Sequence, residues 1–130
     1  MFLDTNVFIH IYCGSGPQAE RSRHLLNRIA KGEQNARTST LVINELLYYL
    51  SGRKGIERAT QNVHTVLSTP NLEVLGVYAP SIPLAMDYMK RGLETSDAFH
   101  AALMKQNGIK TLCSYDKDFD KIKEITRKEP

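Results

Sequence analysis

The sequence has few of the features that define several protein classes. It contains two cysteines, Cys13 and Cys113, no tryptophan, and no apolar run near eighteen residues in length. The two cysteines form neither a CxxC motif nor a disulfide framework, so we expect both to be reduced and buried. The lack of a long apolar run excludes a membrane-spanning helix. Because a charge at Asp4 comes too early for a signal peptide, we expect a cytoplasmic protein.

An excess of charge of one sign is also missing. The formal net charge is only +3, which does not require a nucleic-acid partner. The charges are unevenly distributed, however. Residues 21–37 carry five basic side chains against one acidic side chain, and residues 53–58 carry three against one. Such stripes either follow the phosphates of a nucleic acid or form the solvated face of a helix.

The order of apolar patterns predicts an α/β fold for residues 1–130, taken as a single domain. Short apolar runs alternate with amphipathic helical segments, which is typical of a three-layer α/β/α sandwich with a central parallel sheet. We expect strands at 1–3, 36–39, 72–77 and 109–113, a helix that begins near residue 7, and a short helical turn at 119–121. Further helices are expected at 17–31, 40–50, 56–67, 82–90 and 96–106, and 127–130 should be a frayed tail.

Three acidic residues occupy element ends where a ligand could bind. Asp4 follows the first expected strand and Asp116 follows the last one. In open α/β sheets ligands bind beyond the carboxyl ends of strands, although a lone Asp there is more often a helix cap or a turn residue. Asp97 lies in the first turn of its helix, where a carboxylate also stabilises the helix dipole. Each position therefore has a structural explanation of its own.

Glu45 is the acidic residue that local structure explains least. Its helical neighbours at three and four residues are Leu41, Val42, Tyr48 and Tyr49, so it lies on an apolar stripe. Glutamate is rarely buried unless it is paired or functional. We expect Tyr48, Tyr49 and Leu50 to pack in the core rather than to form an interface.

If Asp4, Glu45, Asp97 and Asp116 converge, they predict a metal site. At about 5 Å separation each carboxylate pair repels by roughly 3 kcal/mol at an effective dielectric of 20, so a cation is needed. Oxygen ligands select Mg²⁺ or Mn²⁺. Such an ion can activate water and stabilise a leaving oxygen, which favours phosphodiester hydrolysis. The four histidines lack metal-ligand spacing and are interpreted as structural or surface residues; only His100, one turn from Asp97, is kept as a lower-ranked site residue.

The acidic residues stand in motifs that resemble those of PIN-domain ribonucleases of the VapC toxin type. The similarity covers nearly the whole chain, in length and in motif order. It rests on Leu3–Asn6, Asn44–Leu47, Ser96–Ala102 and Ser114–Phe119.

The resemblance implies a parallel-sheet α/β/α fold and endonucleolytic cleavage of RNA with one or two Mg²⁺ or Mn²⁺ ions. Asp4, Glu45 and Asp97 match the most constant acids of the family, and Asp116 matches a more variable fourth. It also implies that Asn6 and Ser114 support the site by hydrogen bonds, with Asp118 as a lower-ranked spare acid. Members of the family commonly form homodimers and are inhibited by an antitoxin protein.

Two other functions are compatible with parts of the sequence. A phosphatase of the haloacid-dehalogenase type also begins with an Asp after its first strand, but it needs a second Asp two positions later, where this chain has Asn6. A PIN relative that binds RNA or protein without catalysis is the other alternative, and the four intact acidic positions argue against it.

Overall fold

Five short strands form one parallel sheet in the computed structural model, which describes residues 1–130. The strands follow one another across the sheet in the order β3-β2-β1-β4-β5. Their bounds are β1 (Phe2–Leu3), β2 (Ala36–Ser39), β3 (Leu72–Leu75), β4 (Thr111–Cys113) and β5 (Thr126–Lys128). The predicted parallel α/β architecture is confirmed.

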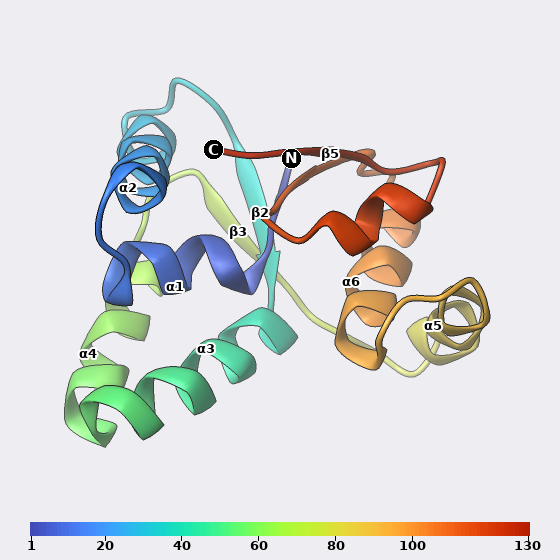
Figure 1. The fold of residues 1–130 in the computed structure, drawn as a ribbon, viewed down its shortest axis with the longest axis horizontal. Helices are drawn as coiled ribbons and strands as arrows, with labels where there is room; N and C mark the ends of the chain where they lie inside the picture. The colour runs from blue at the N-terminus through green and yellow to red at the C-terminus, as the bar shows by residue number, and fades with distance from the viewer.

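The helices cover both faces of this sheet. In Figure 1, α1 to α4 lie on one side of the strands, and α5, α6 and η1 lie on the other side. Their bounds are α1 (Thr5–Cys13), α2 (Pro17–Ala30), α3 (Thr40–Lys54), α4 (Ile56–Leu67), α5 (Ser81–Lys90), α6 (Thr95–Gln106) and the 3₁₀ helix η1 (Lys117–Lys121). The arrangement is the predicted three-layer α/β/α sandwich. No helix combines the length and the apolar character needed to cross a bilayer.

The order of the strands creates a switch point between β1 and β4. The chain first builds outward from β1 through β2 to β3, and then returns to the other side of β1 to add β4 and β5. The backbone N–H of Asp4 donates to the carbonyl of Cys113 at 3.1 Å, which joins the carboxyl ends of the two strands. In open parallel sheets this is the place where ligands bind.

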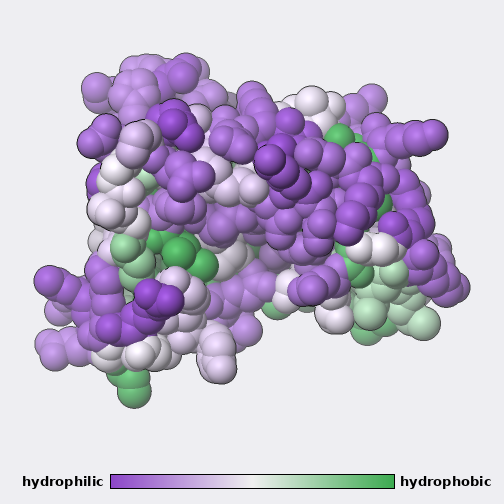
Figure 2. Space-filling view, viewed as in Figure 1, coloured by the Kyte–Doolittle hydropathy of each residue, from purple (hydrophilic) through white to green (hydrophobic).

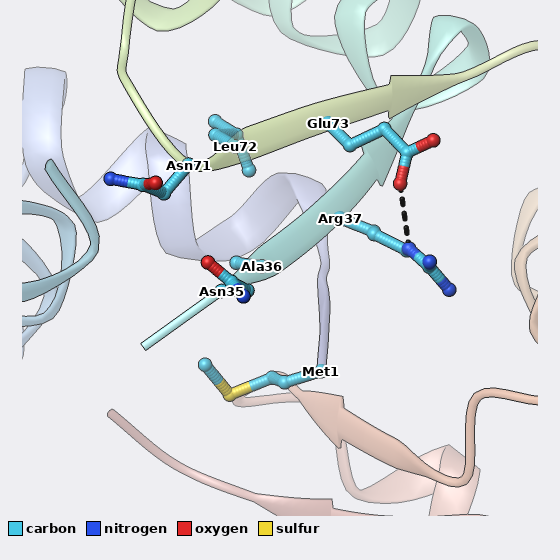
Figure 3. Close-up of a pocket in the computed structure, with 7 residues that line it drawn as sticks. All are labelled: Met1, Asn35, Ala36, Arg37, Asn71, Leu72 and Glu73. Atoms are coloured by element: carbon cyan, nitrogen blue, oxygen red, sulfur yellow. Dashed lines mark hydrogen bonds and ion pairs between the residues drawn. The ribbon is translucent and has the colours of Figure 1, made fainter. Parts of the chain in front are cut away.

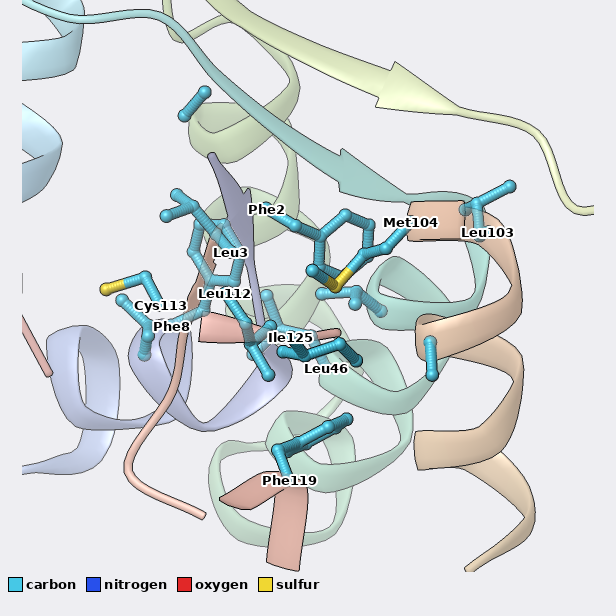
Figure 4. Packing of buried hydrophobic residues seen from close by; sticks show 14 of the residues in the cluster. Phe2, Leu3, Phe8, Leu46, Leu103, Met104, Leu112, Cys113, Phe119 and Ile125 are labelled. Carbon is cyan, nitrogen blue, oxygen red and sulfur yellow. The ribbon is translucent and has the colours of Figure 1, made fainter. Parts of the chain in front are cut away.

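The core forms around the central strands. Figure 4 shows Phe2, Leu3 and Leu112 of these strands among side chains that include Leu46 of α3 and Met104 of α6. Small residues on α6, Ala98, Ala101 and Ala102, are fully buried, so α6 can pack closely on the sheet. The amino end of α6, with Asp97, therefore lies next to the switch point.

Two predictions about α3 are wrong. The helix does not end at Ser51-Gly52 but continues to Lys54, and Gly55, whose φ of +79° suits glycine, ends it. Tyr48 does not pack in the core, because 84% of its surface is exposed, whereas Leu50 is buried. Successive side chains on a helix point in different directions, so a run of apolar residues cannot all face the core.

The carboxyl end of the chain is also ordered differently from the prediction. Residues 127–130 were expected to fray, but Thr126–Lys128 is strand β5, paired in parallel with β4. The Arg127 side chain is only 12% exposed; it forms an ion pair with Asp120 at 2.8 Å and donates to the Ser114 carbonyl at 3.0 Å. The contacts of Arg127 with Asp120 and Ser114 form only in the folded chain, so the local sequence pattern did not predict them. The expected burial of both free cysteines holds for Cys113, but Cys13 is partly exposed.

We expect Arg127→Ala to destabilise the protein by about 1–3 kcal/mol, since it removes charged hydrogen bonds that hold β5 and the Ser114 backbone. Urea unfolding measures the change. Lys90→Ala is the matched control, because it removes a cation from an exposed pair with Asp87. Equal stability of the two variants would show that Arg127 does not anchor the strand.

Candidate active site

The four predicted carboxylates, far apart in the sequence, surround one cavity at the switch point. The cavity has a volume of about 450 Å³. Asp4 follows β1, Glu45 projects from α3, Asp97 lies in the first turn of α6, and Asp116 follows β4. The other lining residues are Thr5, Asn6, Ile9, Asn44, Tyr48, Tyr49, Glu94 and Ser96.

Asp4 is the most buried of these acids, with 4% of its surface exposed. It is the N-cap of α1, and its carboxylate accepts hydrogen bonds from Thr5 N at 2.6 Å, Asn6 Nδ2 at 2.7 Å and Ser114 Oγ at 2.6 Å. Burial raises the pKa of Asp4, while the His100 charge and these hydrogen bonds lower it, so the net shift is upward. The carboxylate is thus held in one orientation at the floor of the cavity.

Asn6 and Ser114 join the β1 end of the site to the β4 end. Asn6 Nδ2 lies 2.9 Å from Ser114 Oγ, and Asn6 Oδ1 accepts from the backbone N–H of Tyr115 at 3.1 Å. Ser114 Oγ also accepts from the backbone N–H of Asp116 at 2.9 Å. The two side chains therefore fix the position of Asp4 and of the loop that carries Asp116.

Glu45 is held by three side chains from two other helices, α1 and α6. Thr5 Oγ1 and Ser96 donate to its carboxylate, and His100 Nε2 lies 3.2 Å from Oε2. Burial raises the pKa of Glu45, but the hydrogen bond and charge of His100, with the other two donors, outweigh burial and lower the pKa to about 2. Glu45 is therefore ionised at neutral pH, and the stripe that seemed apolar in the sequence has a polar partner for it.

His100 has a larger place in the site than the sequence suggested. Its side chain is 1% exposed, and Nε2 faces both Glu45 and Asp4, 3.8 Å from Asp4 Oδ1. Burial lowers the pKa of His100, but the Glu45 hydrogen bond and the charges of Asp4, Glu45 and Asp97 raise it further than burial lowers it. His100 acts as a buried counter-charge. Its Nδ1 is buried without a hydrogen-bond partner.

Asp97 is the least compensated carboxylate of the cluster. The causes of its pKa shift are burial and nearby charges, with no hydrogen bond from the protein among them. Burial, and then repulsion by Asp4, Asp116 and Glu45, raise the pKa of Asp97 to about 7 against the opposing effect of His100. A carboxyl in this state is electrostatically destabilised when ionised, and a bound cation would relieve the repulsion.

Asp116 and Asp118 differ in where their carboxylates lie. Asp116 lines the cavity, and its Oδ1 also caps η1 by accepting from the N–H of Asp118 at 2.8 Å. Asp118 instead pairs with Lys121 at 2.8 Å and does not line the cavity. The structure thus brings Asp116 to the cluster and leaves Asp118 outside it.

The family model of the PIN domain matches residues 1–125, which include all four carboxylates of the cavity. The chain belongs to the PIN-domain family. Among curated proteins, a VapC ribonuclease of Mycobacterium bovis and the ribonuclease VapC13 of Mycobacterium tuberculosis are each 26% identical to it, with 98% of both chains covered.

Solved structures share the fold of this PIN domain. The VapC20 toxin of Mycobacterium tuberculosis superposes with a TM-score of 0.74 at 22% identity, over 92% of each chain. A chain of the VapBC2 complex of Rickettsia felis, bound to a DNA fragment, gives a TM-score of 0.75 at 21% identity, over 98% of this chain and 96% of that chain. The comparison places the cavity on a PIN fold.

The residues of this PIN domain suit a divalent metal ion. Single ligand atoms of Asp4, Asp97 and His100 all lie within 4.8 Å of one another. Burial, and after it repulsion within the cluster, raises the pKa of Asp97, and carboxylate oxygens are ligands for hard cations. Because His100 Nε2 is engaged with Glu45, the ring is better placed as a donor to that carboxylate than as a ligand.

A second hollow, of about 430 Å³, lies at the opposite, amino end of the sheet (Figure 3). It is lined by Met1, Asn35, Ala36, Arg37, Asn71, Leu72 and Glu73. Its two charged side chains, Arg37 and Glu73, pair with each other at 2.7 Å. The hollow has no cluster of like charges, whereas four carboxylates meet in the cavity at the switch point, so that cavity is the candidate active site.

Proposed function

We propose that this PIN domain is a metal-dependent endoribonuclease and the toxin of a toxin–antitoxin pair. The observation that carries the proposal is the convergence of Asp4, Glu45, Asp97 and Asp116 on one cavity at the switch point of the sheet. The two curated relatives are named VapC ribonucleases and match over 98% of the chain.

The four carboxylates are proposed to hold Mg²⁺ or Mn²⁺, since oxygen ligands favour these ions. When bound, such an ion supplies Lewis acidity and an activated water for attack on a phosphodiester. The protein's own contribution is to hold the carboxylates. Asn6 and Ser114 orient Asp4, while Thr5, Ser96 and His100 orient Glu45.

The proposed function is tested by incubating the protein with a pool of single-stranded RNA in Mg²⁺ or Mn²⁺. We expect internal cleavage of the RNA. Binding of RNA without cleavage in either metal would favour a non-catalytic PIN relative. Hydrolysis of a small phosphomonoester through a phosphoenzyme at Asp4 would favour a phosphatase instead.

The hydrogen bond from Ser114 to Asp4 predicts a smaller loss of activity than removal of a carboxylate would cause. Ser114→Ala removes the 2.6 Å donor to Asp4 and the acceptor for Asp116 N–H. Loss of a hydrogen bond that orients a metal ligand typically costs about 10–100-fold in metal affinity or activity. Cleavage rates over a range of Mg²⁺ concentrations measure the effect. Ser51→Ala, at a partly exposed site on α3 where Ser51 Oγ bonds only to the Tyr48 carbonyl, should leave the rate unchanged.

The surface also suggests how partners bind. Ile82, Met86 and Met89 form an exposed apolar stripe on α5, and Figure 2 shows green side chains over the region of α5 in Figure 1. We propose that this stripe is the contact of a homodimer and that an antitoxin protein covers the active site. The Rickettsia felis neighbour is a VapBC complex.

The homodimer is tested by the solution mass. Light scattering is expected to give twice the 14.7 kDa of one chain, and Met86→Asp should give a single chain. Ile56→Asp, at an even more exposed apolar position on α4, is the control. A single-chain mass for the unmodified protein would exclude the homodimer.

A further inference from the structure

Tyr48 is the most exposed of the large hydrophobic side chains, and nothing in the carboxylate network uses it. It lies three residues after Glu45, one helical turn along α3, and lines the same cavity as the carboxylates. The Tyr48 ring has 84% of its surface exposed to water. It therefore contributes none of the stabilisation that burial of an aromatic side chain in the core would give. Its position suits contact with whatever occupies the cavity.

The same face of α3 continues from this ring to a positive charge. Tyr49, four residues after Glu45, also lines the cavity, and the guanidinium carbon of Arg53 lies 4.9 Å from the centre of its ring. This cation–π contact holds Arg53 in place. At 1.5 Å rise per residue, Arg53 lies about 12 Å from Glu45 along the helix axis. Carboxylates, aromatic rings and a cation thus follow one another along α3.

The basic residues near this face differ from those of residues 21–37, which the sequence also singled out. Arg28 and Arg37 pair with Glu33 and Glu73, and Arg23 donates to backbone carbonyls. By contrast, Arg53 has no carboxylate partner, and Arg58 lies exposed nearby at the start of α4. Arg53 and Arg58 are therefore able to meet a phosphate beyond Tyr48, on the α3 side of the site.

We propose that Tyr48 is a stacking subsite for one unpaired base of a single-stranded RNA, and that Arg53 contacts a backbone phosphate further along that strand. This inference rests on the proposed ribonuclease function and names its substrate class. Unpaired bases stack on exposed aromatic side chains, whereas bases inside a duplex already stack on one another. The subsite therefore selects single strands over duplexes.

The chemistry around Tyr48 fits a nucleic acid better than a protein. The residues near it along α3 are polar or small, with Asn44 on one side and Gly52 and Arg53 on the other. A protein-binding face is usually a contiguous apolar patch, as on α5. Tyr48 is instead one exposed ring between the carboxylates and the Arg53 cation, an arrangement that matches one nucleotide of a strand.

The test is single-turnover cleavage of a single-stranded RNA pool in Mg²⁺ or Mn²⁺, whichever supports cleavage, at increasing protein concentration. Tyr48→Ala should raise the half-saturating concentration about 5–150-fold, the range measured for loss of one base–aromatic stack, with little change in the maximal rate. Tyr48→Phe should behave like the unmodified protein. Arg53→Ala should weaken binding and reduce the salt dependence by about one phosphate contact. Tyr78→Ala, which removes an exposed tyrosine outside the cavity, is the control.

Several outcomes would overturn the subsite. A half-saturating concentration for Tyr48→Ala equal to that of Tyr78→Ala would do so, as would a fall in maximal rate alone. A change of solution mass in Tyr48→Ala would assign the ring to a second copy, and loss of antitoxin binding with unchanged cleavage would assign it to a protein. If the unmodified protein cleaves no RNA, the ribonuclease proposal fails, and fluorescence anisotropy with labelled single-stranded and duplex RNA still decides whether Tyr48 stacks a base.

Discussion

Asp97→Asn is expected to lower RNA cleavage at least about 1000-fold while leaving the fold intact. Lewis-acid assistance by a bound metal contributes several kcal/mol, and each 1.4 kcal/mol corresponds to tenfold in rate. Asp97 is suited to this test because burial and nearby charges, rather than hydrogen bonds that the substitution would break, determine the pKa of its carboxyl. Asp4→Asn would be harder to interpret, because three donors bond to the Asp4 carboxylate and the substitution would also disturb those hydrogen bonds.

The same substitution should stabilise the metal-free protein at neutral pH. Repulsion by Asp4, Asp116 and Glu45 contributes to the raised pKa of Asp97, about 7, and a neutral amide removes that repulsion. Thermal melts in EDTA at pH 8 measure the gain. Asp118→Asn is the control, because Asp118 pairs with Lys121 outside the cavity and should leave cleavage unchanged. Cleavage by Asp97→Asn at the rate of the Asp118→Asn protein would remove Asp97 from the active site.

The parts of the site that follow strands could be predicted from the sequence. Parallel strands end at the same edge of a sheet, so Asp4 after β1 and Asp116 after β4 were expected at one edge. Only the structure shows that β1 and β4 are neighbours, which brings the two residues together. The order of short apolar runs also predicted the layers of the fold. These inferences depend only on local periodicity and on the general geometry of α/β proteins.

The partners of Glu45 could not be predicted in this way. Thr5 belongs to α1, Ser96 and His100 belong to α6, and Glu45 belongs to α3, so only the folded chain brings these donors to one carboxylate. The position of His100, one turn after Asp97, indicated that it could lie near the site, but the spacing of the histidines matches no metal-binding motif. The same reason explains β5, whose anchor Arg127 depends on contacts with Asp120 and Ser114.

Removal of divalent metal is expected to stop cleavage and to destabilise the protein most above pH 7. The sign follows from three groups. Asp97 has a folded-state pKa of about 7 against 3.8 for an ordinary Asp, so between these values the folded protein binds more protons and its stability falls as pH rises. The raised pKa of His100 acts in the same direction, since its contribution is lost as pH rises through the folded-state pKa. Glu45, with a pKa near 2, loses its contribution only in acid, below about 4.5.

The metal-free protein should therefore be most stable near pH 5, and added Mg²⁺ should raise its melting temperature at pH 8 far more than at pH 5. Metal ligands must be deprotonated, so protons compete with the ion at the lower pH. A metal concentration one hundred times the dissociation constant stabilises by about 2.7 kcal/mol. Melting curves in EDTA and in Mg²⁺ between pH 5 and pH 8.5 test this expectation, with Asp97→Asn as the variant that should lose most of the difference. Identical curves with and without metal at pH 8, together with cleavage that persists in EDTA, would mean that the carboxylates act without an ion.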